Sequence, residues 1–255
     1  MLLAASWTPW IIAAAAAIVI PWLLFTEFSY FGAGSIRRVY NGMSRNYNKK
    51  WKRKEYQSKE LTSRVFLEPL RKALDDSTEA RVLDLACGTG RTTFLLLSEA
   101  WFQGRIHALD LSPGMLAKFR ASLKKLPTEK SERVSSAEAN LIGWTAKEEA
   151  AFDAVVMLEA SEFIPRPAPL MTEVLRTLKP GGLFLMTKPR GWLAWMYFSR
   201  KQRAGQLRAL LESTGFQNVR LTPWSPRHDV VYAWKAGVAQ DGQQTNQAEA
   251  ASASA

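Results

Sequence analysis

One stretch of the sequence combines an acid with small residues in an order that suits ligand binding. It covers residues 82–90, VLDLACGTG. Residues 82–85 are apolar apart from Asp84, which is typical of a buried strand. Gly88 and Gly90 have no Cβ, so the backbone can adopt positive φ there and a ligand can lie against it. Residues 91–98 are predicted to form a helix, and a strand, a glycine-rich turn and a helix form the ligand-binding start of a doubly wound α/β sheet.

A second acid follows at a spacing that suits a nucleoside ligand. Residues 106–111, IHALDL, are predicted to form a second strand, and Asp110 near its end lies twenty residues after Gly90. An acid at this position can accept hydrogen bonds from ribose hydroxyls. Ser112 and Pro113 then suit the N-cap and the first position of another helix. The alternative is a structural strand–turn–helix unit that holds no ligand.

The position of the acid separates two families of adenosine-binding proteins. Dinucleotide dehydrogenases carry Gly-x-Gly-x-x-Gly/Ala, and Thr93 stands where the third small residue should be. Asp84, Gly88 and Gly90 instead resemble the (Asp/Glu)-x-Gly-x-Gly-x-Gly motif of class I S-adenosylmethionine-dependent methyltransferases, with Ala86 in place of the first glycine. Four later stretches resemble further motifs of that family in the same order: 110–116 DLSPGML, 138–141 EANL, 152–157 FDAVVM and 175–182 LRTLKPGG.

The resemblance implies a fold, a cofactor and the residues that bind it. The fold is α/β, a doubly wound, seven-stranded, mostly parallel sheet of the Rossmann-like class I methyltransferase type, in which strand seven is antiparallel and lies between strands five and six. The cofactor is S-adenosyl-L-methionine. Its expected contacts are Asp84, Ala86, Gly88 and Gly90 at the methionine end, Asp110 at the ribose, Leu111, Glu138 and Ala139 at the adenine, and Leu158 and Glu159 on the reaction side.

Residues 39–48, VYNGMSRNYN, carry a closer resemblance. They are similar to the Ala-x-x-Tyr-Asp segment of the ubiquinone/menaquinone-type (type 11) methyltransferases, where the tyrosine belongs to an N-terminal lid near the cofactor. Tyr47 occupies the matching position, with Asn48 in place of the aspartate. Tyr47 is therefore a further candidate cofactor contact, and an ordinary interfacial tyrosine is the alternative.

Methyl transfer from a sulfonium requires alignment more than acid–base chemistry. Holding nucleophile, methyl and sulfur in line can supply about 7–11 kcal/mol of barrier reduction. The candidate bases are Glu159, Glu162 and His228, each predicted to lie in a loop, where a structural or solvated role is the alternative. Cys87, the one cysteine, is more easily explained as a small turn residue than as a nucleophile. Two histidines and one cysteine at scattered positions predict no metal site.

The N-terminus predicts a membrane anchor. Residues 2–26 carry no charge, and twenty-five helical residues at about 1.5 Å each would span a hydrocarbon core of about 30 Å. Trp7 and Trp10 lie at one end and Trp22 and Phe28 near the other, which is typical of two membrane–water interfaces. A cleaved signal peptide is disfavoured because no Lys or Arg precedes the apolar stretch. A buried helix of a soluble protein is the alternative.

The charge distribution sets the expected orientation. The chain carries a net charge of +11, and residues 36–72 hold twelve Lys or Arg against three Glu, a net +9. The positive-inside bias puts the N-terminus outside and everything after Gly34 in the cytoplasm. The basic run is then a juxtamembrane segment near anionic headgroups. A nucleic-acid surface is a minor alternative, because no nucleic-acid-binding motif accompanies the charge.

The predicted organisation has four parts, an anchor over residues 1–35, a basic juxtamembrane and lid segment over 36–75, a methyltransferase domain over 76–236 and a disordered tail over 237–255. Residues 61–74 are predicted to form the first helix on the sheet and residues 124–133 a solvated loop. Residues 191–198, GWLAWMYF, predict either a second membrane contact that admits a lipid or a core helix with a charged end.

These observations together predict a single-pass membrane protein with its catalytic domain on the cytoplasmic face. It would transfer a methyl group to a lipid, a quinone or another hydrophobic small molecule, with the membrane as partner and no nucleic acid. One alternative is methylation of a hydrophobic xenobiotic or thiol. The other is a non-catalytic, membrane-tethered module that keeps the methyltransferase fold.

Overall fold

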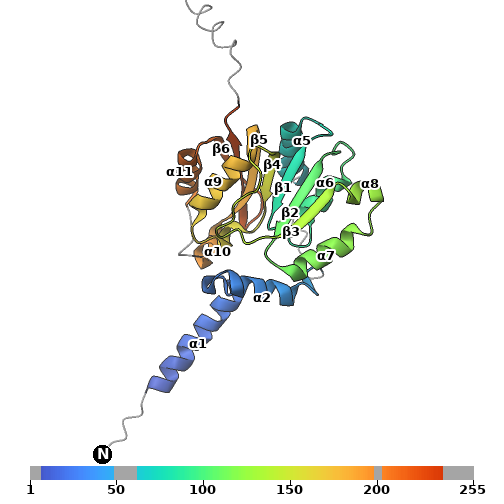
Figure 1. Cartoon of the computed structure of the whole chain (residues 1–255). Helices are drawn as coiled ribbons and strands as arrows, with labels where there is room; N and C mark the ends of the chain where they lie inside the picture. The colour runs from blue at the N-terminus through green and yellow to red at the C-terminus, as the bar shows by residue number, and fades with distance from the viewer. Residues whose placement is uncertain (1–6, 49–61, 198–202, 238–255) are drawn as a thin grey trace, which may run out of the picture.

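The computed structural model describes residues 7–48, 62–197 and 203–237. Its centre is a seven-stranded sheet in the order β3-β2-β1-β4-β5-β7-β6 (Figure 1). The strands are β1 Arg81–Leu85, β2 Arg105–Asp110, β3 Val134–Glu138, β4 Phe152–Met157, β5 Leu178–Pro189, β6 Phe216–Pro223 and β7 His228–Lys235. The first five strands pair in parallel, and β7 is antiparallel to both β5 and β6. The fold predicted from the sequence is confirmed.

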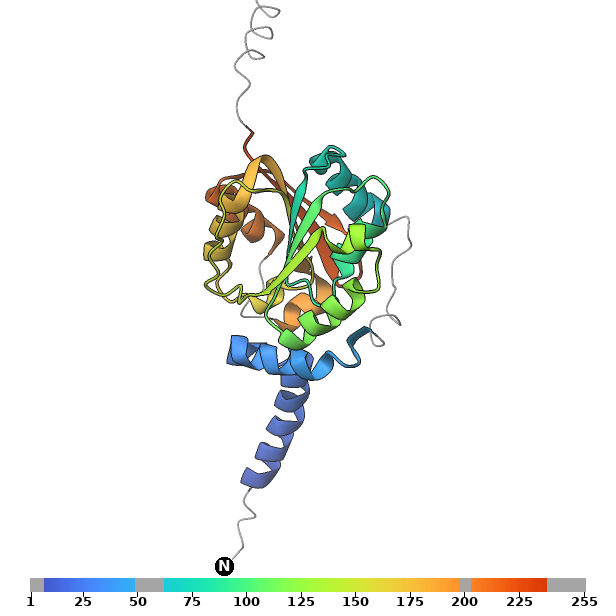
Figure 2. The same ribbon diagram turned by 45° about the vertical axis from the view of Figure 1, so that its right-hand side comes forward.

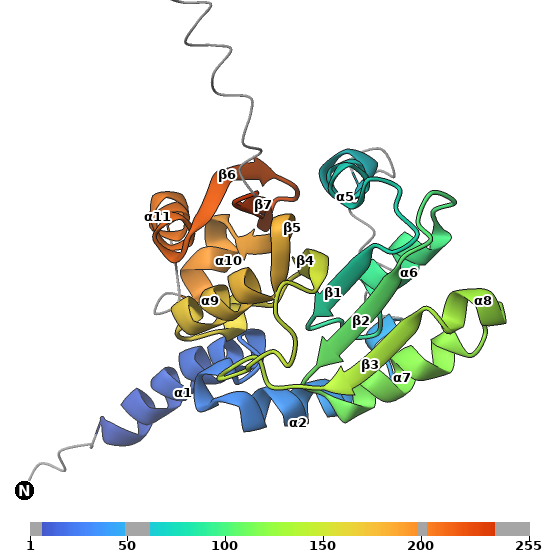
Figure 3. The same cartoon turned by 45° about the horizontal axis from the view of Figure 1, so that its top comes forward.

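Helices cover both faces of the sheet, as Figure 3 shows. One apolar core lies under α5 (Glu68–Leu74), α6 (Arg91–Ser98) and α7 (Pro113–Leu123). The other lies under α9 (Pro167–Thr177) and α11 (Ala204–Thr214). The central strands β1 and β4 are almost fully buried, because a parallel sheet covered on both faces has no solvent-facing side, whereas the edge strands β3 and β6 are partly exposed. The order reverses between β1 and β4, and ligands of such sheets bind beyond the carboxyl ends of strands at that point.

Three local predictions differ from the structure. Residues 124–133 are not simply a loop, since they include the short helix α8, Thr128–Ser131. Leu178 to Gly182 does not precede strand five but belongs to it, with a register shift between Phe152 and Ala154 of the neighbouring β4. The predicted helix over 61–74 begins within a π-helical turn, Ser63–Leu67, that continues into α5, and Leu61 lies outside the described residues.

Proline explains the π-helical turn. Pro69 has no N–H, so it cannot make the helical hydrogen bond to the carbonyl of Val65 four residues earlier. The structure gives that carbonyl another donor, because the Tyr232 hydroxyl donates to it over 2.8 Å. A buried hydrogen bond therefore fastens the turn to β7, the strand that also carries part of the site described below.

The N-terminal elements lie at the end of the sheet where β1, β2 and β4 finish. They are α1 (Thr8–Phe25), the 3-10 turn Ser29–Phe31 and α2 (Ala33–Met43). Figures 1 and 2 show α2 lying across the domain while α1 points away from it. The end of α1 contacts α10 (Gly191–Met196), where the Trp22 indole donates to the Met196 carbonyl over 3.0 Å and the Phe25 ring lies 5.1 Å from that of Trp192.

The predicted spanning helix at the N-terminus is not supported by the structure. Within residues 7–48, 62–197 and 203–237, no helix is both long and apolar enough to cross a membrane. Residues 191–198 agree in part with both of their predicted roles. Leu193 and Ala194 are buried, as in a core helix, whereas Trp192 and Trp195 are 54% and 68% exposed, as a membrane contact would require. Phe198 lies outside the described residues, as does most of the tail over 237–255.

Candidate functional site

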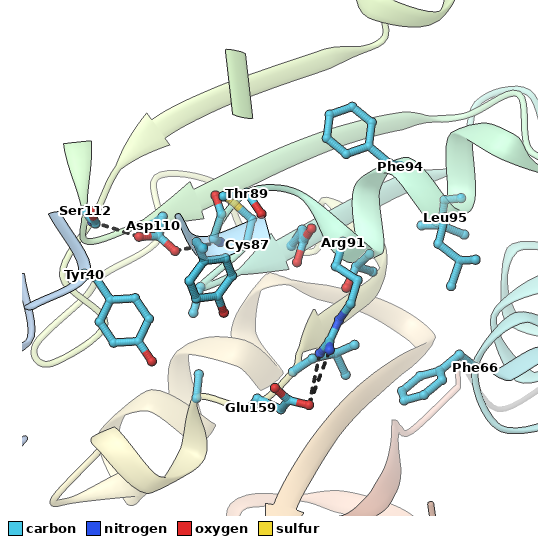
Figure 4. A pocket seen from close by; sticks show the side chains of 18 of the residues that line it. Tyr40, Phe66, Cys87, Thr89, Arg91, Phe94, Leu95, Asp110, Ser112 and Glu159 are labelled. Atoms are coloured by element: carbon cyan, nitrogen blue, oxygen red, sulfur yellow. Dashed lines mark hydrogen bonds and ion pairs between the residues drawn. The ribbon is translucent and has the colours of Figure 1, made fainter. Parts of the chain in front are cut away.

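A cavity of about 1210 Å³ opens at the carboxyl ends of β1, β2 and β4. Its lining comes from the turn after β1, the end of β2, the segment after β4, α2, the π-helical turn with α5, and the loop between β6 and β7. Figure 4 shows Asp110 and Ser112 at one side of the cavity and Phe66 at the other, with Arg91 and Glu159 between them. The cavity therefore joins the predicted cofactor turn to a second region that the motifs did not reach.

Asp84 is held inside the sheet at the base of this cavity. Its side chain is buried, and its Oδ2 accepts a hydrogen bond of 2.8 Å from the Thr93 hydroxyl. Burial raises the pKa of Asp84 from 3.8 to about 7, and the nearby Asp110 contributes to the rise. Thr93 stands at the position where a dehydrogenase carries glycine or alanine, and here its hydroxyl donates a hydrogen bond to the acid of the motif, Asp84.

The turn after β1 adopts the left-handed backbone that its sequence suggests. Residues Ala86, Gly88 and Gly90 have φ of 55°, 57° and 95°. A Cβ on Gly90 would lie 2.4 Å from the Phe119 ring, whereas one on Gly88 would meet nothing within 4 Å. Gly90 is therefore required for packing, and Gly88 leaves open space for a ligand. Ala86 stands where the family motif has glycine, and its positive φ is a strained conformation for a residue with a Cβ.

Asp110 is fixed by the backbone of both neighbouring turns. Its Oδ1 accepts from the N–H of Ser112 over 2.8 Å, and its Oδ2 accepts from the N–H of Gly88 over 2.7 Å. Burial raises the pKa of Asp110, and these hydrogen bonds oppose the rise. Each carboxylate oxygen keeps a further lone pair, so the group can still accept from two ribose hydroxyls. Leu111 lines the cavity beside it.

The structure places Glu138 and Ala139 differently from the other predicted contacts. Glu138 is 44% exposed in its side chain and forms an ion pair of 2.6 Å with Arg37 of α2. Neither Glu138 nor Ala139 is among the residues that line the cavity, whereas the next two residues, Asn140 and Leu141, are. In this structure the cavity wall on that side therefore lies two positions further along the chain than the predicted pair.

Helix α2 and the turn after it cover the cofactor side of the cavity. Asn41 Oδ1 accepts from the Ser112 hydroxyl over 2.6 Å and from the N–H of Gly114 over 3.0 Å. Asn48 Oδ1 accepts from the Thr89 hydroxyl over 2.7 Å. These contacts attach the N-terminal segment directly to the two turns that carry the motif residues.

Tyr47 lines the cavity within this cover, and burial raises its pKa. Its ring centre lies 6.2 Å from that of Tyr40, which in turn lies 5.8 Å from that of Phe163. Sequence reasoning singled out Tyr47 but missed Arg37, Tyr40 and Asn41. Their spacing was the available signal, because positions 37, 40, 41 and 44 share one face of a helix.

The segment after β4 faces the opposite side of the cavity. Leu158 and Glu159 both line it, and Glu159 has a φ of 51° that is held by a 2.6 Å hydrogen bond from its N–H to the Thr187 hydroxyl. The Glu159 carboxylate lies 3.3 Å from the guanidinium of Arg91, as Figure 4 shows. That guanidinium also lies 5.6 Å from the ring centre of Trp224.

The loop prediction for two of the candidate bases is wrong. Glu162 belongs to the 3-10 turn Ser161–Phe163, and His228 begins β7. Both side chains are buried because these elements face each other at the end of the sheet, and His228 Nε2 lies 3.7 Å from Glu162 Oε1. His228 lines the large cavity, and Glu162 lines a neighbouring one of about 130 Å³. The structure thus brings together two candidates that are 66 positions apart in the sequence.

The remaining chemistry-bearing side chains have local functions. Burial raises the pKa of the Cys87 thiol, which disfavours a thiolate nucleophile. His107 Nδ1 lies 2.7 Å from the Ser135 hydroxyl on the adjacent strand, outside the cavity lining. In the part of the chain that the structure describes, no three His, Cys, Asp or Glu side chains are grouped so that they could hold a metal ion.

Comparison with known proteins connects this site to a family. Residues 82–182 match the sequence model of a methyltransferase domain. The chain contains an S-adenosylmethionine-dependent methyltransferase domain. The class predicted from the motifs is therefore confirmed, and so is its cofactor, S-adenosylmethionine. Asp84, residues 86–89, Asp110 and residues 158–159 all fall within the matched range and line the cavity, whereas Gly90 lies in the matched range but not in the cavity lining.

Three curated relatives are similar to part of the chain. The trans-aconitate 2-methyltransferase of Azoarcus sp. is 34% identical over 119 residues, 47% of this chain and 42% of the relative. The ubiquinone biosynthesis O-methyltransferase of Xanthomonas oryzae is 36% identical over 118 residues, 45% and 46% of the two chains. The demethylmenaquinone methyltransferase of Lactococcus lactis is 28% identical and covers 58% and 55%. The chain thus spans about half the length of the curated relatives it matches.

Solved structures share the fold of the methyltransferase domain. Haemonchus contortus phosphoethanolamine N-methyltransferase 2, in complex with S-adenosyl-L-methionine, aligns with a TM-score of 0.57 at 20% identity, covering 67% of this chain and 52% of that one. The glycopeptide N-methyltransferase MtfA, also with S-adenosyl-L-methionine, aligns with a TM-score of 0.53 at 21% identity, covering 67% and 87%. At these identities the likeness supports the fold and leaves the acceptor undetermined.

Proposed function

We propose that the chain is an enzyme that transfers the methyl group of S-adenosylmethionine to a hydrophobic small molecule, a lipid or a quinone, by in-line displacement. One observation carries the proposal: the cofactor turn opens into a cavity of about 1210 Å³. That volume exceeds the usual range of about 300–1,000 Å³ for a single drug-sized ligand. The cavity therefore has room for the cofactor and an acceptor together.

The lining of the second region favours an apolar acceptor. Its walls are largely hydrophobic side chains from the π-helical turn, α5, α6 and the loop before β7, namely Phe66, Leu67, Leu70, Leu95 and Trp224. Arg91 and Arg227 are cations in this lining, and Arg91 is already paired with Glu159. A polyanion such as the trans-aconitate named for one relative would need more positive charge than this. The names of the other two relatives, which belong to quinone biosynthesis, agree better with the lining.

The acceptor region lies near a surface that suits a membrane. The exposed apolar side chains of α1 include Trp10, Ile11 and Ile18, and α10 adds Trp192 and Trp195. The contact between Phe25 and Trp192 makes the two helices one continuous apolar surface. Aromatic and aliphatic side chains next to a basic segment are typical of helices that enter the headgroup region of a bilayer. We therefore propose attachment to a membrane through the N-terminal helix, with the domain on the cytoplasmic side.

Transfer of a labelled methyl group into a total membrane-lipid extract tests the proposal. The full chain in detergent is incubated with methyl-labelled S-adenosylmethionine and the extract, and label is counted in the organic phase. The Asp110→Ala variant is the control for cofactor binding, because it removes both oxygens that the Gly88 and Ser112 backbones hold in place. Label that depends on Asp110 supports the proposal. Cofactor binding without transfer to lipids, xenobiotics or thiols supports the non-catalytic alternative instead.

A further inference from the structure

The loop between β6 and β7 leaves two buried polar groups facing the acceptor region. The Trp224 side chain is 5% exposed and the His228 side chain 7% exposed, and both residues line the large cavity. Among the described residues, the indole Nε1 of Trp224 has no hydrogen-bond partner, and the imidazole Nε2 of His228 has none within hydrogen-bond distance, its nearest polar neighbour being Glu162 Oε1 at 3.7 Å. Burying a polar group without a partner costs free energy. The unpartnered indole N–H of Trp224 in a ligand cavity is therefore available to a bound molecule, and the ring of His228 lies beside it, 6.3 Å away between ring centres.

Local structure fixes these two side chains relative to each other. The carbonyl of His228 accepts hydrogen bonds from the N–H groups of Trp224 and Ser225, over 3.1 and 3.0 Å, and the Ser225 hydroxyl accepts from the N–H of His228 over 3.0 Å. The indole is held from its other side by Phe66, whose ring centre lies 4.6 Å away in an edge-on contact. Both groups are therefore preorganised, and neither needs to be ordered by a ligand.

The two nitrogens of the imidazole have different surroundings. Nε2 is buried and lies 3.7 Å from Glu162 Oε1. Because His228 lines the large cavity and its Nε2 lies beside Glu162, Nδ1 is the ring nitrogen left for a molecule in that cavity. A carboxylate on one side of an imidazole stabilises the protonated ring that forms when the other nitrogen accepts a proton. Because both partners are buried, solvent and salt screen this interaction weakly.

Other charged groups near the imidazole have partners of their own. They are Lys188 and Arg190 at the end of β5, Arg227 and Asp229 on either side of His228 in the chain, and Arg91 across the cavity. Asp229 forms an ion pair of 3.2 Å with Arg190, and Arg91 forms one of 3.3 Å with Glu159. Glu162 is the carboxylate at ion-pair distance from His228.

We propose that His228, with Glu162 as its positioning residue, is the general base for a hydroxyl acceptor whose oxygen the Trp224 N–H helps to bind. The inference rests on the proposed function and narrows it to O-methylation of a mainly apolar molecule that carries a phenolic or similarly acidic hydroxyl. The oxygen attacks the methyl carbon, the carbon–sulfur bond breaks, and its electron pair stays on sulfur. The hydroxyl proton moves to Nδ1 of His228 and leaves to water with the products, a methyl ether and S-adenosylhomocysteine.

Phenols of different acidity test the base directly. The full chain in detergent is given S-adenosylmethionine with para-heptylphenol, or with its ortho-nitro analogue at a pH where that analogue is already ionised. General-base catalysis contributes about 10²–10⁴-fold. His228→Asn is therefore expected to lower kcat on para-heptylphenol by about 100-fold or more and to be much less harmful on the ionised analogue, which needs no base. Glu162→Gln should have a lower kcat on para-heptylphenol than the wild type and a different pH profile of that rate. Trp224→Phe should raise KM for the phenol.

Controls separate this inference from loss of folding and from failure of the proposed function. His107→Gln changes the other histidine, which lies outside the cavity, and should leave both reactions unchanged. Thermal unfolding and calorimetric binding of S-adenosylmethionine show whether each variant is intact. Equal loss by His228→Asn on both phenols overturns the proposal. So does methyl transfer to para-heptylaniline or para-heptylthiophenol but to neither phenol, or no transfer to a phenol by a chain that binds the cofactor. Absence of cofactor binding defeats the proposed function itself.

Discussion

Replacing Asp84 with asparagine should stabilise the free protein at alkaline pH. The pKa of the buried carboxyl is about 7, against 3.8 for the exposed group. Because the folded pKa is the higher one, the protonated carboxyl favours folding: this contribution is fully present below about pH 4 and is lost as the pH rises to about 7. Three pKa units correspond to about 4 kcal/mol. The Asp84→Asn variant keeps an oxygen for the Thr93 hydroxyl but never has to bury a charge.

The expected gain can be read in thermal unfolding of the cofactor-free protein. At pH 8 the variant should be more stable by up to about 4 kcal/mol. The difference should fall to less than half of that at pH 5 and nearly vanish below about pH 4. For a domain of this size, 1 kcal/mol shifts Tm by about 2–4 °C, so the rise at pH 8 is on the order of 10 °C. Asp110, whose pKa is also raised by burial, remains in both proteins, and the loss of its repulsion with an ionised Asp84 is part of the expected gain.

The same carboxyl should make cofactor binding depend on pH. S-adenosylmethionine is a cation at its sulfonium, so it favours the ionised form of Asp84. Below pH 7 a proton must leave Asp84 before the cofactor binds, and Kd should weaken about tenfold between pH 8 and pH 6. Calorimetric titration of wild type and Asp84→Asn at the two pH values measures this, and the variant should lose that tenfold dependence. Equal Kd values for the wild type at both pH values, together with no added stability of the variant at pH 8, would refute the reasoning.

Three further predictions concern the parts that surround the cofactor turn. Asn41→Ala removes the acceptor for the N–H of Gly114, so it should weaken S-adenosylmethionine binding about three- to tenfold, as calorimetry would show; an unchanged Kd would mean that α2 does not help to hold the site. Tyr232→Phe removes the hydroxyl that donates to a carbonyl of the π-helical turn. A urea titration should show a free energy of unfolding lower by about 1–3 kcal/mol. A decrease of less than about 0.5 kcal/mol would contradict that role. Trp192→Ser combined with Trp195→Ser removes two exposed rings and should reduce co-sedimentation with anionic vesicles, and full retention on the vesicles would remove α10 from the proposed membrane surface.

The sequence predicts best what depends on neighbouring residues. Asp84, Gly88 and Gly90 are close in the chain, and the backbone that they need follows from residue type, so their turn could be predicted. Helix 91–98 agrees with the structure residue for residue. The place of antiparallel strand seven between strands five and six could also be predicted, because it comes with the motifs of the family, and the structure confirms it.

The acceptor region could not be predicted, because its residues meet only when the chain is folded. Glu162 and His228 come from a 3-10 turn and a strand that no local pattern connects. Nothing in the sequence around Trp224 indicates a site residue, because its contact with Phe66 forms only in the folded chain. The spacing of Asn41 with residues 37 and 40 indicated a shared helix face, but its hydrogen-bond partners more than 70 positions away were hidden. These contacts follow from packing of distant elements, for which one sequence carries no periodicity or spacing.

The most direct test of the account is single-turnover transfer of a labelled methyl group by the full chain in detergent, with para-heptylphenol as acceptor. We expect a labelled methyl ether, formed in an amount equal to the S-adenosylhomocysteine released, and we expect Asp110→Ala to abolish its formation. A chain that binds S-adenosylmethionine and releases no S-adenosylhomocysteine, with this phenol or with the membrane-lipid extract, would contradict the claim that the cavity is the active site of a methyltransferase.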